Sequence, residues 1–294
     1  MPVRRLTLAV LLIAVLAATA AGVPFVNTAG PGPWQHVSVR GEPVEVYGIG
    51  PYRHMPADVA VQGLAQDLVT LAAGIPFLLF AWWWARRGSR AGHVALCGAV
   101  AYLFVQYFMY LGMGTYNELF LVYVLLVGLT FLALTRLLLA VPTANFAVNL
   151  PAARRRFVGV FLLVNGTLVA LLWLSVVVPP LLAGTLYPAD LANFTTLIVQ
   201  GFDLALFLPP SLLAGYWYLK QRPAGELLAP VYVVFLSLQM VALLAKIVWM
   251  AARGVSAGPA LVLIPLLLLG AIMAAFFALS ALAAPPKRDP SVTA

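Results

Sequence analysis

Charged residues are scarce in this sequence of 294 residues. Only 9% of the residues are Asp, Glu, Lys or Arg, whereas 63% are hydrophobic, and the mean hydropathy is +1.00. Soluble domains carry about 25% charged residues. The shortage excludes an ordinary soluble domain and predicts a protein that lies in a membrane.

Cysteine and histidine are also rare. Cys97 is the only cysteine, which excludes an internal disulfide, a CxxC redox centre and a cysteine-rich zinc site. None of the three histidines lies in the middle of an apolar run, so paired haem ligands are excluded, but a metal site at His36 and His54 stays open. The P-loop, HExxH, GxSxG and dinucleotide motifs are absent as well. We therefore expect no cofactor.

Long apolar runs are what the sequence has instead. A membrane-crossing helix needs roughly 20 mainly apolar residues. The predicted fold is an all-α integral membrane protein with eight transmembrane helices, at about 6–22, 65–85, 92–113, 117–140, 157–179, 196–218, 227–250 and 259–283. The first run, opened by Arg4-Arg5 and followed by small residues, also fits a cleaved secretory signal.

Basic residues are concentrated in every second loop. If the N-terminus is cytoplasmic, the cytoplasmic segments hold 13 of the 17 Lys and Arg residues, while the outer side holds seven of the nine acids. Lys and Arg in short loops mark the cytoplasmic side, so we predict that both termini are cytoplasmic. The basic residues form short clusters between apolar runs and no continuous stripe, which argues against nucleic acid as a partner.

The two halves of the chain share a sequence pattern. Corresponding segments are Arg4-Arg5 and Arg155-Arg156, Val61-Gln62-Gly63 and Val199-Gln200-Gly201, Asp67-Leu68 and Asp203-Leu204, and Ala91-Gly92 and Ala224-Gly225, which also pairs Gln106 with Gln239. We predict two parallel four-helix repeats, residues 1–150 and 151–294, related by an axis along the membrane normal. A counterpart in the second half favours a retained first helix over a cleaved signal.

The first loop, predicted at residues 23–63, is long enough to hold structure of its own. Val37, Val39, Val44 and Val46 alternate with other residues and are interrupted by Arg40-Gly41-Glu42-Pro43. This pattern predicts a small β-hairpin with a four-residue turn on the outer side.

Polar residues gather in the outer half of the predicted spans. At 1.5 Å per residue, Asp67 lies about 28 Å above Arg86, close to the outer boundary of a hydrocarbon core about 30 Å thick. Asp203 and Lys246 fall at a similar depth, and a lysine there could neutralise a carboxylate. We predict a cavity open to the outer side, with the ligand-binding candidates Asp67, Asp203, Gln106, Gln239, Lys246, Tyr110, Asn117 and Glu118. The structural alternative is that these side chains anchor helix ends at the interface.

Two stretches resemble a known group of proteins. Gln66-Asp67-Leu68, the basic turn that follows and Tyr116-Asn117 with Phe120 and Tyr123 are similar to a group of bacterial membrane proteins with no assigned activity, as is the stretch from Asp203-Leu204 through Gly225. The resemblance implies eight helices and a bacterial inner-membrane location, and it brings no mechanism. Lys246 is not part of the shared pattern.

Three functions stay open at this point. The first is binding or transport of a small solute or lipid. The second is a non-catalytic scaffold, sensor or subunit of a membrane complex, with a partner protein at the outer loop. The third is an enzyme that acts on a lipid or quinone with two carboxylates as acid and base, although no positioned nucleophile is visible. The inner half of the spans lacks polar groups, which argues against a pathway across the whole membrane.

Overall fold

The structure is a computed structural model that describes residues 6–113, 115–188, 191–252, 254 and 260–283. It is 78% helical, and its described part has eight helices long and apolar enough to span a membrane, in agreement with an all-α membrane protein. The helices are α1 (Thr7–Val26), α2 (Ala57–Val69), α3 (Ile75–Arg86), α4 (Arg90–Gly112), α5 (Phe120–Leu139), α6 (Ala152–Leu182), α7 (Ile198–Phe202), α8 (Leu208–Leu219), α9 (Pro223–Ala252) and α10 (Ala260–Ala283). Two of the spans are composite, α2 with α3 and α7 with α8.

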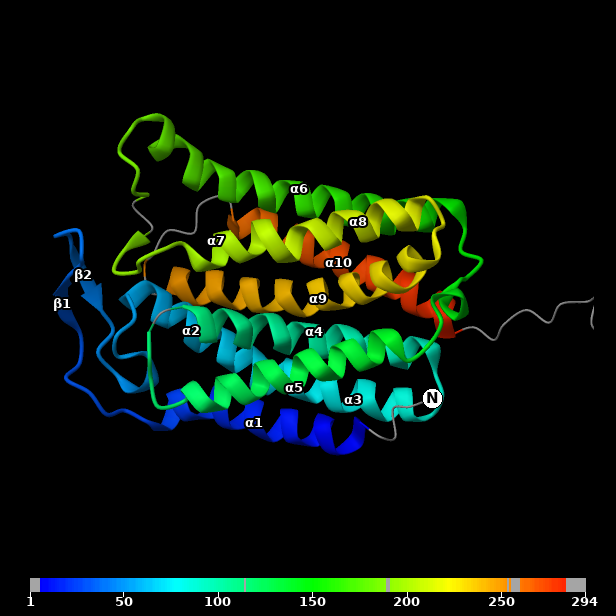
Figure 1. Cartoon of the computed structure of the whole chain (residues 1–294), viewed down its shortest axis with the longest axis horizontal. Helices are drawn as coiled ribbons and strands as arrows, with labels where there is room; N and C mark the ends of the chain where they lie inside the picture. Colours follow the sequence, from blue (N-terminus) through cyan, green and yellow to red (C-terminus); the bar gives the residue numbers. More distant parts are fainter. Residues whose placement is uncertain (1–5, 114, 189–190, 253, 255–259, 284–294) are drawn as a thin grey trace, which may run out of the picture.

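The helices form one elongated bundle with two different ends (Figure 1). One end carries the strands β1 (Trp34–Val37) and β2 (Pro43–Val46), and we call it the hairpin end. The other end carries the arginines and lysines of the turns after α3 and α8 and of the start of α6, and we call it the basic end.

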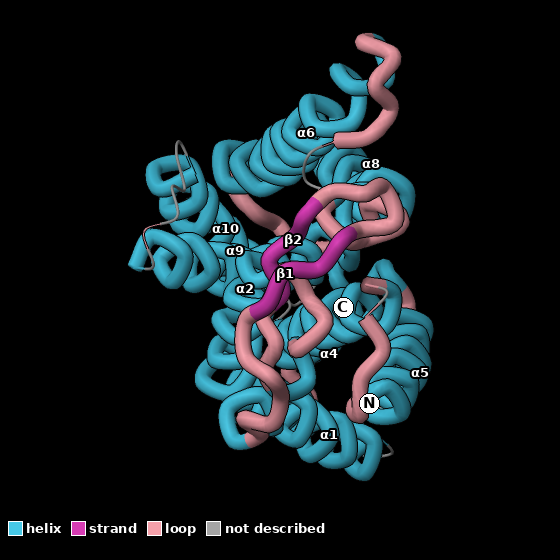
Figure 2. The backbone as a smooth tube through the Cα atoms, turned by 90° about the vertical axis from the view of Figure 1, so that its left-hand side faces the viewer, coloured by secondary structure: helices cyan, strands magenta, loops and turns pink. Residues whose placement is uncertain are grey.

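The bundle consists of two groups of helices that meet at its centre. Helices α1 to α5 form one group and α6 to α10 the other, with α4 and α9 packed against each other between them (Figures 1 and 2). A Cβ added to Gly98 of α4 would lie 2.7 Å from Cβ of Val234 in α9. The missing side chain therefore lets the two central helices approach closely, as small residues do in membrane helix packing.

The composite spans share an irregular backbone. A five-residue π-helix joins α2 to α3 at Thr70–Gly74, and another joins α7 to α8 at Asp203–Phe207. Each is followed by a helix of 12 residues with proline at its second position, Pro76 or Pro209. A proline donates no backbone hydrogen bond to the preceding turn, and local π-helical adjustment is one way in which a membrane span accommodates this. The span therefore continues through both prolines.

The turns that follow these helices are also alike. Gly88 ends the first turn with a φ of 81°, and Gln221 takes the same place in the second turn with a φ of 53°. A Cβ on Gly92 would come within 2.6 Å of the backbone of α3, and a Cβ on Gly225 within 2.5 Å of the backbone of α8. Thr70 and Asp203 each begin a π-helix, whereas the sequence pattern paired Asp203 with Asp67. The two four-helix repeats stay a prediction.

The two strands pair in antiparallel fashion, with Trp34 opposite Val46 and Val37 opposite Pro43. Pro43 was expected in the turn and instead begins β2. Arg40 in the turn donates hydrogen bonds to the carbonyl oxygens of Phe194, at 3.0 Å, and of Ala192. These bonds fix the hairpin to the loop between α6 and α7, across the end of the bundle (Figure 2).

A buried ion pair holds the basic end of the second group together. Arg155 of α6 pairs with Glu226 of α9, and both side chains are buried. The guanidinium also donates to the carbonyl oxygen of Val148 at 2.9 Å and of Tyr218 at 3.3 Å. A buried charge is tolerable when it is paired and hydrogen-bonded in this way, so α6, α8 and α9 are fixed relative to each other at this end.

Several predicted boundaries require correction. The first loop was placed at 23–63, but α1 continues to Val26 and α2 already begins at Ala57. The fourth span was expected to begin at 117, but α5 begins at Phe120, which leaves Asn117 and Glu118 in the preceding loop. The charged residues predicted near the termini and after α9, namely Arg4, Arg5, Arg253, Lys287, Arg288 and Asp289, lie outside the described residues.

Candidate functional site

A cavity of about 720 Å³ lies between the two groups of helices, toward the hairpin end. It is lined by residues of α2, α4, α6, α7, α8, α9 and α10 and by the loop before α7. The cavity exists because the two composite spans pack differently: α2 lies along α9, whereas α7 barely touches α4. Of the eight predicted ligand-binding residues, the structure brings five to this cavity: Gln106, Tyr110, Asp203, Gln239 and Lys246.

One wall of the cavity carries a chain of hydrogen bonds between α2 and α4. The amide nitrogen of Gln66 donates to the hydroxyl of Tyr102 at 2.9 Å, and that hydroxyl lies 3.2 Å from Oγ1 of Thr70. Thr70 in turn donates to Oε1 of Gln106 at 2.8 Å. The two ends of the chain, Oε1 of Gln66 and Nε2 of Gln106, are buried and have no hydrogen-bond partner. Both residues line the cavity.

Two further unpartnered polar atoms line the opposite wall. Oδ1 of Asn165 in α6 and Oγ of Ser211 in α8 are buried without a hydrogen-bond partner. Asn165 is 1% exposed and Ser211 is 2% exposed. More than nine in ten buried polar groups in proteins are hydrogen-bonded, and leaving one unpaired costs about 1–3 kcal/mol. Four such atoms around one cavity are what a polar ligand would satisfy.

The charged groups of the cavity lie nearer the hairpin end. Asp203 accepts a hydrogen bond from the indole nitrogen of Trp173 at 2.8 Å. Lys246 of α9 lines the same cavity and attracts the carboxylates of Asp203 and Asp67. It takes part in none of the ion pairs among the described residues. Its ammonium group is therefore attracted to both carboxylates without direct contact with either.

Asp67 was predicted in the cavity, but it lies behind the wall. Its carboxylate is fully buried and accepts hydrogen bonds from the hydroxyl of Tyr52 and, at 3.3 Å, from that of Tyr110. Tyr52 comes from the loop that follows the hairpin, outside the spans, and burial and the nearby charge of Asp67 raise its pKa above the ordinary value. The bond to Asp67 thus connects this loop to α2.

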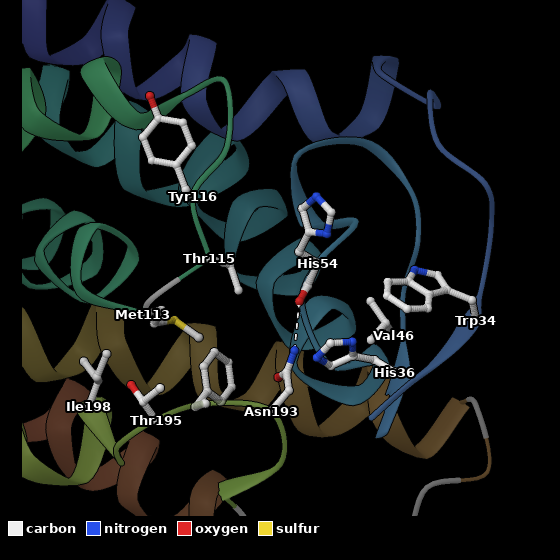
Figure 3. Close-up of a pocket in the computed structure, with 11 residues that line it drawn as sticks. Trp34, His36, Val46, His54, Met113, Thr115, Tyr116, Asn193, Thr195 and Ile198 are labelled. Carbon is white, nitrogen blue, oxygen red and sulfur yellow. Dashed lines mark hydrogen bonds between the residues drawn. The ribbon is translucent and has the colours of Figure 1, made fainter. Parts of the chain in front are cut away.

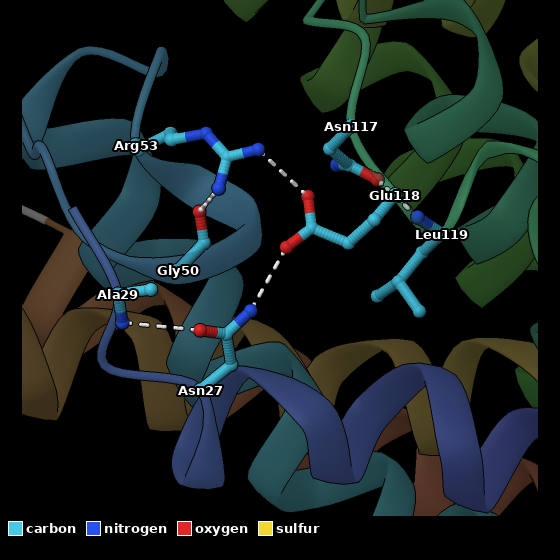
Figure 4. A network of polar contacts seen from close by, with 7 residues as sticks. All are labelled: Asn27, Ala29, Gly50, Arg53, Asn117, Glu118 and Leu119. Atoms are coloured by element: carbon cyan, nitrogen blue, oxygen red, sulfur yellow. Dashed lines mark hydrogen bonds and ion pairs between the residues drawn. The ribbon is translucent and has the colours of Figure 1, made fainter.

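Asn117 and Glu118 have partners in the loops at the hairpin end (Figure 4). Glu118 accepts hydrogen bonds from Asn27 at 2.8 Å and from Arg53 at 3.1 Å, and it forms an ion pair with Arg53. Asn117 accepts a bond from the backbone nitrogen of Leu119 at 2.9 Å. Neither residue lines the cavity, so both connect or shape loops in the first group of helices.

A second pocket of about 380 Å³ lies between the hairpin and the loop before α7 (Figure 3). His36 and His54 both line it, and Asn193 donates to the carbonyl oxygen of His54 at 3.1 Å. No group of three or more His, Cys, Asp or Glu side chains among the described residues could hold a metal ion. Met113, Phe194 and Ile198 line this pocket and also the larger cavity, so the two adjoin.

The comparisons with known proteins give no assignment. Neither a protein-family model nor a curated protein nor a solved structure matches this chain. The bacterial group that the sequence resembles therefore remains a prediction, and the function is inferred from the cavity.

The cavity-lining residues that the sequence did not predict are Gln66, Asn165, Trp173 and Ser211. It also did not predict Thr70 and Tyr102, which belong to the chain of hydrogen bonds between Gln66 and Gln106. Asn165 and Ser211 are isolated polar residues in apolar helices, and an intramembrane polar residue is itself a signal of function. Their convergence on one cavity depends on the packing of α6 against α8. The site offers amide and hydroxyl groups, one lysine and the aspartates Asp58 and Asp203, which is chemistry for binding.

Proposed function

We propose that this protein binds a small molecule inside the membrane, in the 720 Å³ cavity between its two groups of helices. The observation that carries the proposal is that four residues lining this one cavity, Gln66, Gln106, Asn165 and Ser211, each have a buried polar atom without a hydrogen-bond partner. Binding pockets of about 300–1,000 Å³ with mainly apolar walls and a few placed polar groups are typical of small-molecule sites.

The proposal includes an orientation and an internal symmetry. The basic end faces the cytoplasm of a bacterial cell, as the Lys and Arg bias favours, so the cavity lies in the outer half of the membrane. Helix α1 is retained, which its packing supports: Val10, Ile13 and Ala17 are fully buried, and the carbonyl oxygen of Ala17 accepts a bond from Tyr107. The matched π-helices and glycines support two parallel four-helix repeats.

Binding fits the shape of the cavity better than passage across the membrane. On α8, the lining residue nearest the basic end is Ser211, and the turns beyond it do not contribute. The ion pair between Arg155 and Glu226 connects α6 to α9 at that end. A site with this shape holds its ligand and has no second opening toward the basic end among the described residues.

Native mass spectrometry of the protein purified from cell membranes in mild detergent tests the proposal. We expect the wild type to carry a reproducible additional mass. Val169→Trp places a large ring in the cavity wall and should lose that mass, while Leu168→Trp, a neighbour that does not line the cavity, should keep it. Asp203→Asn should weaken binding and leave the protein folded. An empty wild type, or equal occupancy in both tryptophan variants, would refute the proposal.

The hairpin favours a second function, as the partner-binding part of a membrane complex. Val37 at the end of β1 is 65% exposed and Val39 in the turn is 79% exposed, so both apolar side chains are accessible to a partner. Deletion of residues 30–56 should then abolish recovery of a complex in mild detergent. Loss of the bound small molecule with an intact complex would separate this function from the cavity.

A further inference from the structure

The polar groups at the closed end of the cavity are all uncharged. Gln66, Gln106, Asn165 and Ser211 offer amide and hydroxyl groups only. The charged residues that line the cavity, Asp58, Asp203 and Lys246, lie away from this end, and Asp203 and Lys246 have opposite signs and attract each other. A strongly ionic head at the closed end would have to lose its water of hydration without gaining an opposite charge there, which is costly in an apolar site.

The walls between these groups are apolar and continue to the outside of the bundle. Leu172 of α6 lines the cavity and is also 54% exposed. Ile264 and Leu267 of α10 line the cavity from the other side. The surface that surrounds these two helices in a membrane is lipid, so the cavity wall and the lipid-facing surface are continuous at Leu172.

Helices α6 and α10 touch near the basic end and separate toward the hairpin end. A Cβ on Gly270 would lie 2.8 Å from the ring of Phe161, and the rings of Phe157 and Phe277 are 5.7 Å apart. Beyond these contacts α6 diverges from the rest of the bundle (Figures 1 and 2). Val169, Leu172 and Trp173 of α6 then face the cavity.

The end of the cavity that faces the hairpin adjoins the second pocket and is bordered by the loop before α7. Ala192, Phe194 and Leu197 of the loop before α7 line it, and Arg40 of the hairpin binds this loop through the carbonyl oxygens of Ala192 and Phe194. A ligand from water would have to pass between the hairpin and this loop. A ligand from the lipid meets the gap between α6 and α10.

We infer that the cavity takes a lipophilic molecule with a small uncharged head that carries a carbonyl or hydroxyl group, and that this molecule enters from the outer leaflet between α6 and α10. The head reaches the unpartnered atoms of Gln106, Asn165 and Ser211, and the apolar tail lies against Leu172 and Ile264 and extends into the lipid. This inference rests on the proposed function and specifies the class of its ligand.

Binding titrations of the purified protein in phosphatidylcholine nanodiscs test the inference. The probes are decylubiquinone for a carbonyl head and dodecanol for a hydroxyl head, with laurate as a charged amphiphile and the tail-less dimethoxy-methyl-benzoquinone as a water-soluble head. We expect binding of at least one of the first two, and affinities for the other two that are weaker by about tenfold or more. Laurate carries a charge that the closed end does not compensate, and the tail-less quinone lacks the apolar burial of a tail.

Two variants locate the ligand. Ser211→Ala removes a buried oxygen that has no partner, so it should leave the thermal unfolding midpoint of the empty protein unchanged or higher, while the affinity for the bound probe falls about tenfold. Ile264→Trp at the gap should reduce binding, whereas Leu263→Trp, an exposed neighbour that does not line the cavity, should not.

The outcomes distinguish this inference from the proposed function. Equal or tighter binding of laurate or of the tail-less quinone would overturn the lipophilic ligand and leave a small-molecule site in place. Failure of both decylubiquinone and dodecanol to bind would also overturn it. If the wild type carries no additional mass after purification, both the proposed function and this inference are refuted.

Discussion

Helices α2 and α7 both lead into a five-residue π-helix, but their surroundings differ. In α2, seven residues are buried, including Gln66 and Asp67, whereas none is buried in α7. The cause is packing, since α2 lies along α9 while α7 stands away from α4. The first half thus encloses Asp67, whereas Asp203 of the second half lines the cavity.

The difference shows how one backbone plan can serve two purposes. Asp67 is satisfied by Tyr52 and Tyr110, so its role in the structure is to fix a loop and two helices. Asp203 has a single side-chain partner, Trp173, and faces the cavity. A polar group inside a membrane protein must find partners. Asp67 finds them within the first half, whereas Asp203, with its single bond, stays available to a molecule bound in the cavity under the proposed function.

The largest expected effect separates the two aspartates. Asp67→Ala leaves the hydroxyl of Tyr52 buried without an acceptor, and that of Tyr110 with the carbonyl oxygen of Gly63 alone. Together with the space left by the carboxylate, this should lower the free energy of unfolding by roughly 2–4 kcal/mol. Asp203→Ala loses one hydrogen bond at a partly exposed site and should cost about 1 kcal/mol. Unfolding by SDS in mixed micelles measures both, with the exposed Asp58→Ala as the control. Equal losses at the two positions would show that Asp67 and Asp203 do not differ in their contribution to stability.

The second test asks whether the halves are alike at the basic end. A Cβ at Gly92 or at Gly225 meets the backbone of the preceding helix. Overpacking of this kind typically costs about 1–3 kcal/mol, so Gly92→Ala and Gly225→Ala should destabilise the protein by similar amounts. Gly128→Ala in α5 is the matched control, because nothing lies within 4 Å of its added Cβ. A loss at only one of the two glycines would contradict the shared plan.

The third test concerns the hydrogen bond between Tyr52 and Asp67 in the first half. Tyr52→Phe removes the hydroxyl that donates a hydrogen bond to Asp67. It should lower the free energy of unfolding by about 1–2 kcal/mol at neutral pH. Because the pKa of Tyr52 is raised above 10.0 in the folded protein, its hydroxyl contributes stability below pH 10.0 that is lost as the pH rises further. The gap in unfolding free energy between wild type and Tyr52→Phe should therefore shrink above pH 10.0. A gap that stays constant would show that the hydroxyl does not titrate with unfolding.

The sequence predicts the spans because each needs a long apolar run, and such a run is visible residue by residue. It misplaces the start of α2, since Asp58, Gln62 and Gln66 make that stretch look like part of a polar loop. It also places Asp67 in the cavity, because the partner that encloses it, Tyr52, belongs to a loop whose fold the sequence does not reveal. Asn165 and Ser211 escaped notice for the same reason: their meaning depends on which helices pack together.

The smallest effect tests the two turns at the basic end. Gln221 adopts a φ of 53°, the left-handed region in which Gly88 has a φ of 81° in the first half. A side chain costs roughly 1–2 kcal/mol in this region, so Gln221→Gly should stabilise the protein by about 1 kcal/mol, less the extra entropy of glycine in the unfolded chain.

The reciprocal variant completes this test. Nothing lies within 4 Å of a Cβ built on Gly88, so Gly88→Gln introduces only the backbone strain and should destabilise by a similar amount. Both changes are measured as unfolding free energies in the same micelles. Opposite signs at the two positions would show that both turns require the left-handed conformation at this residue. If Gln221→Gly is instead destabilising, the glutamine makes a contact that maintains this turn, and the two turns are held by different means.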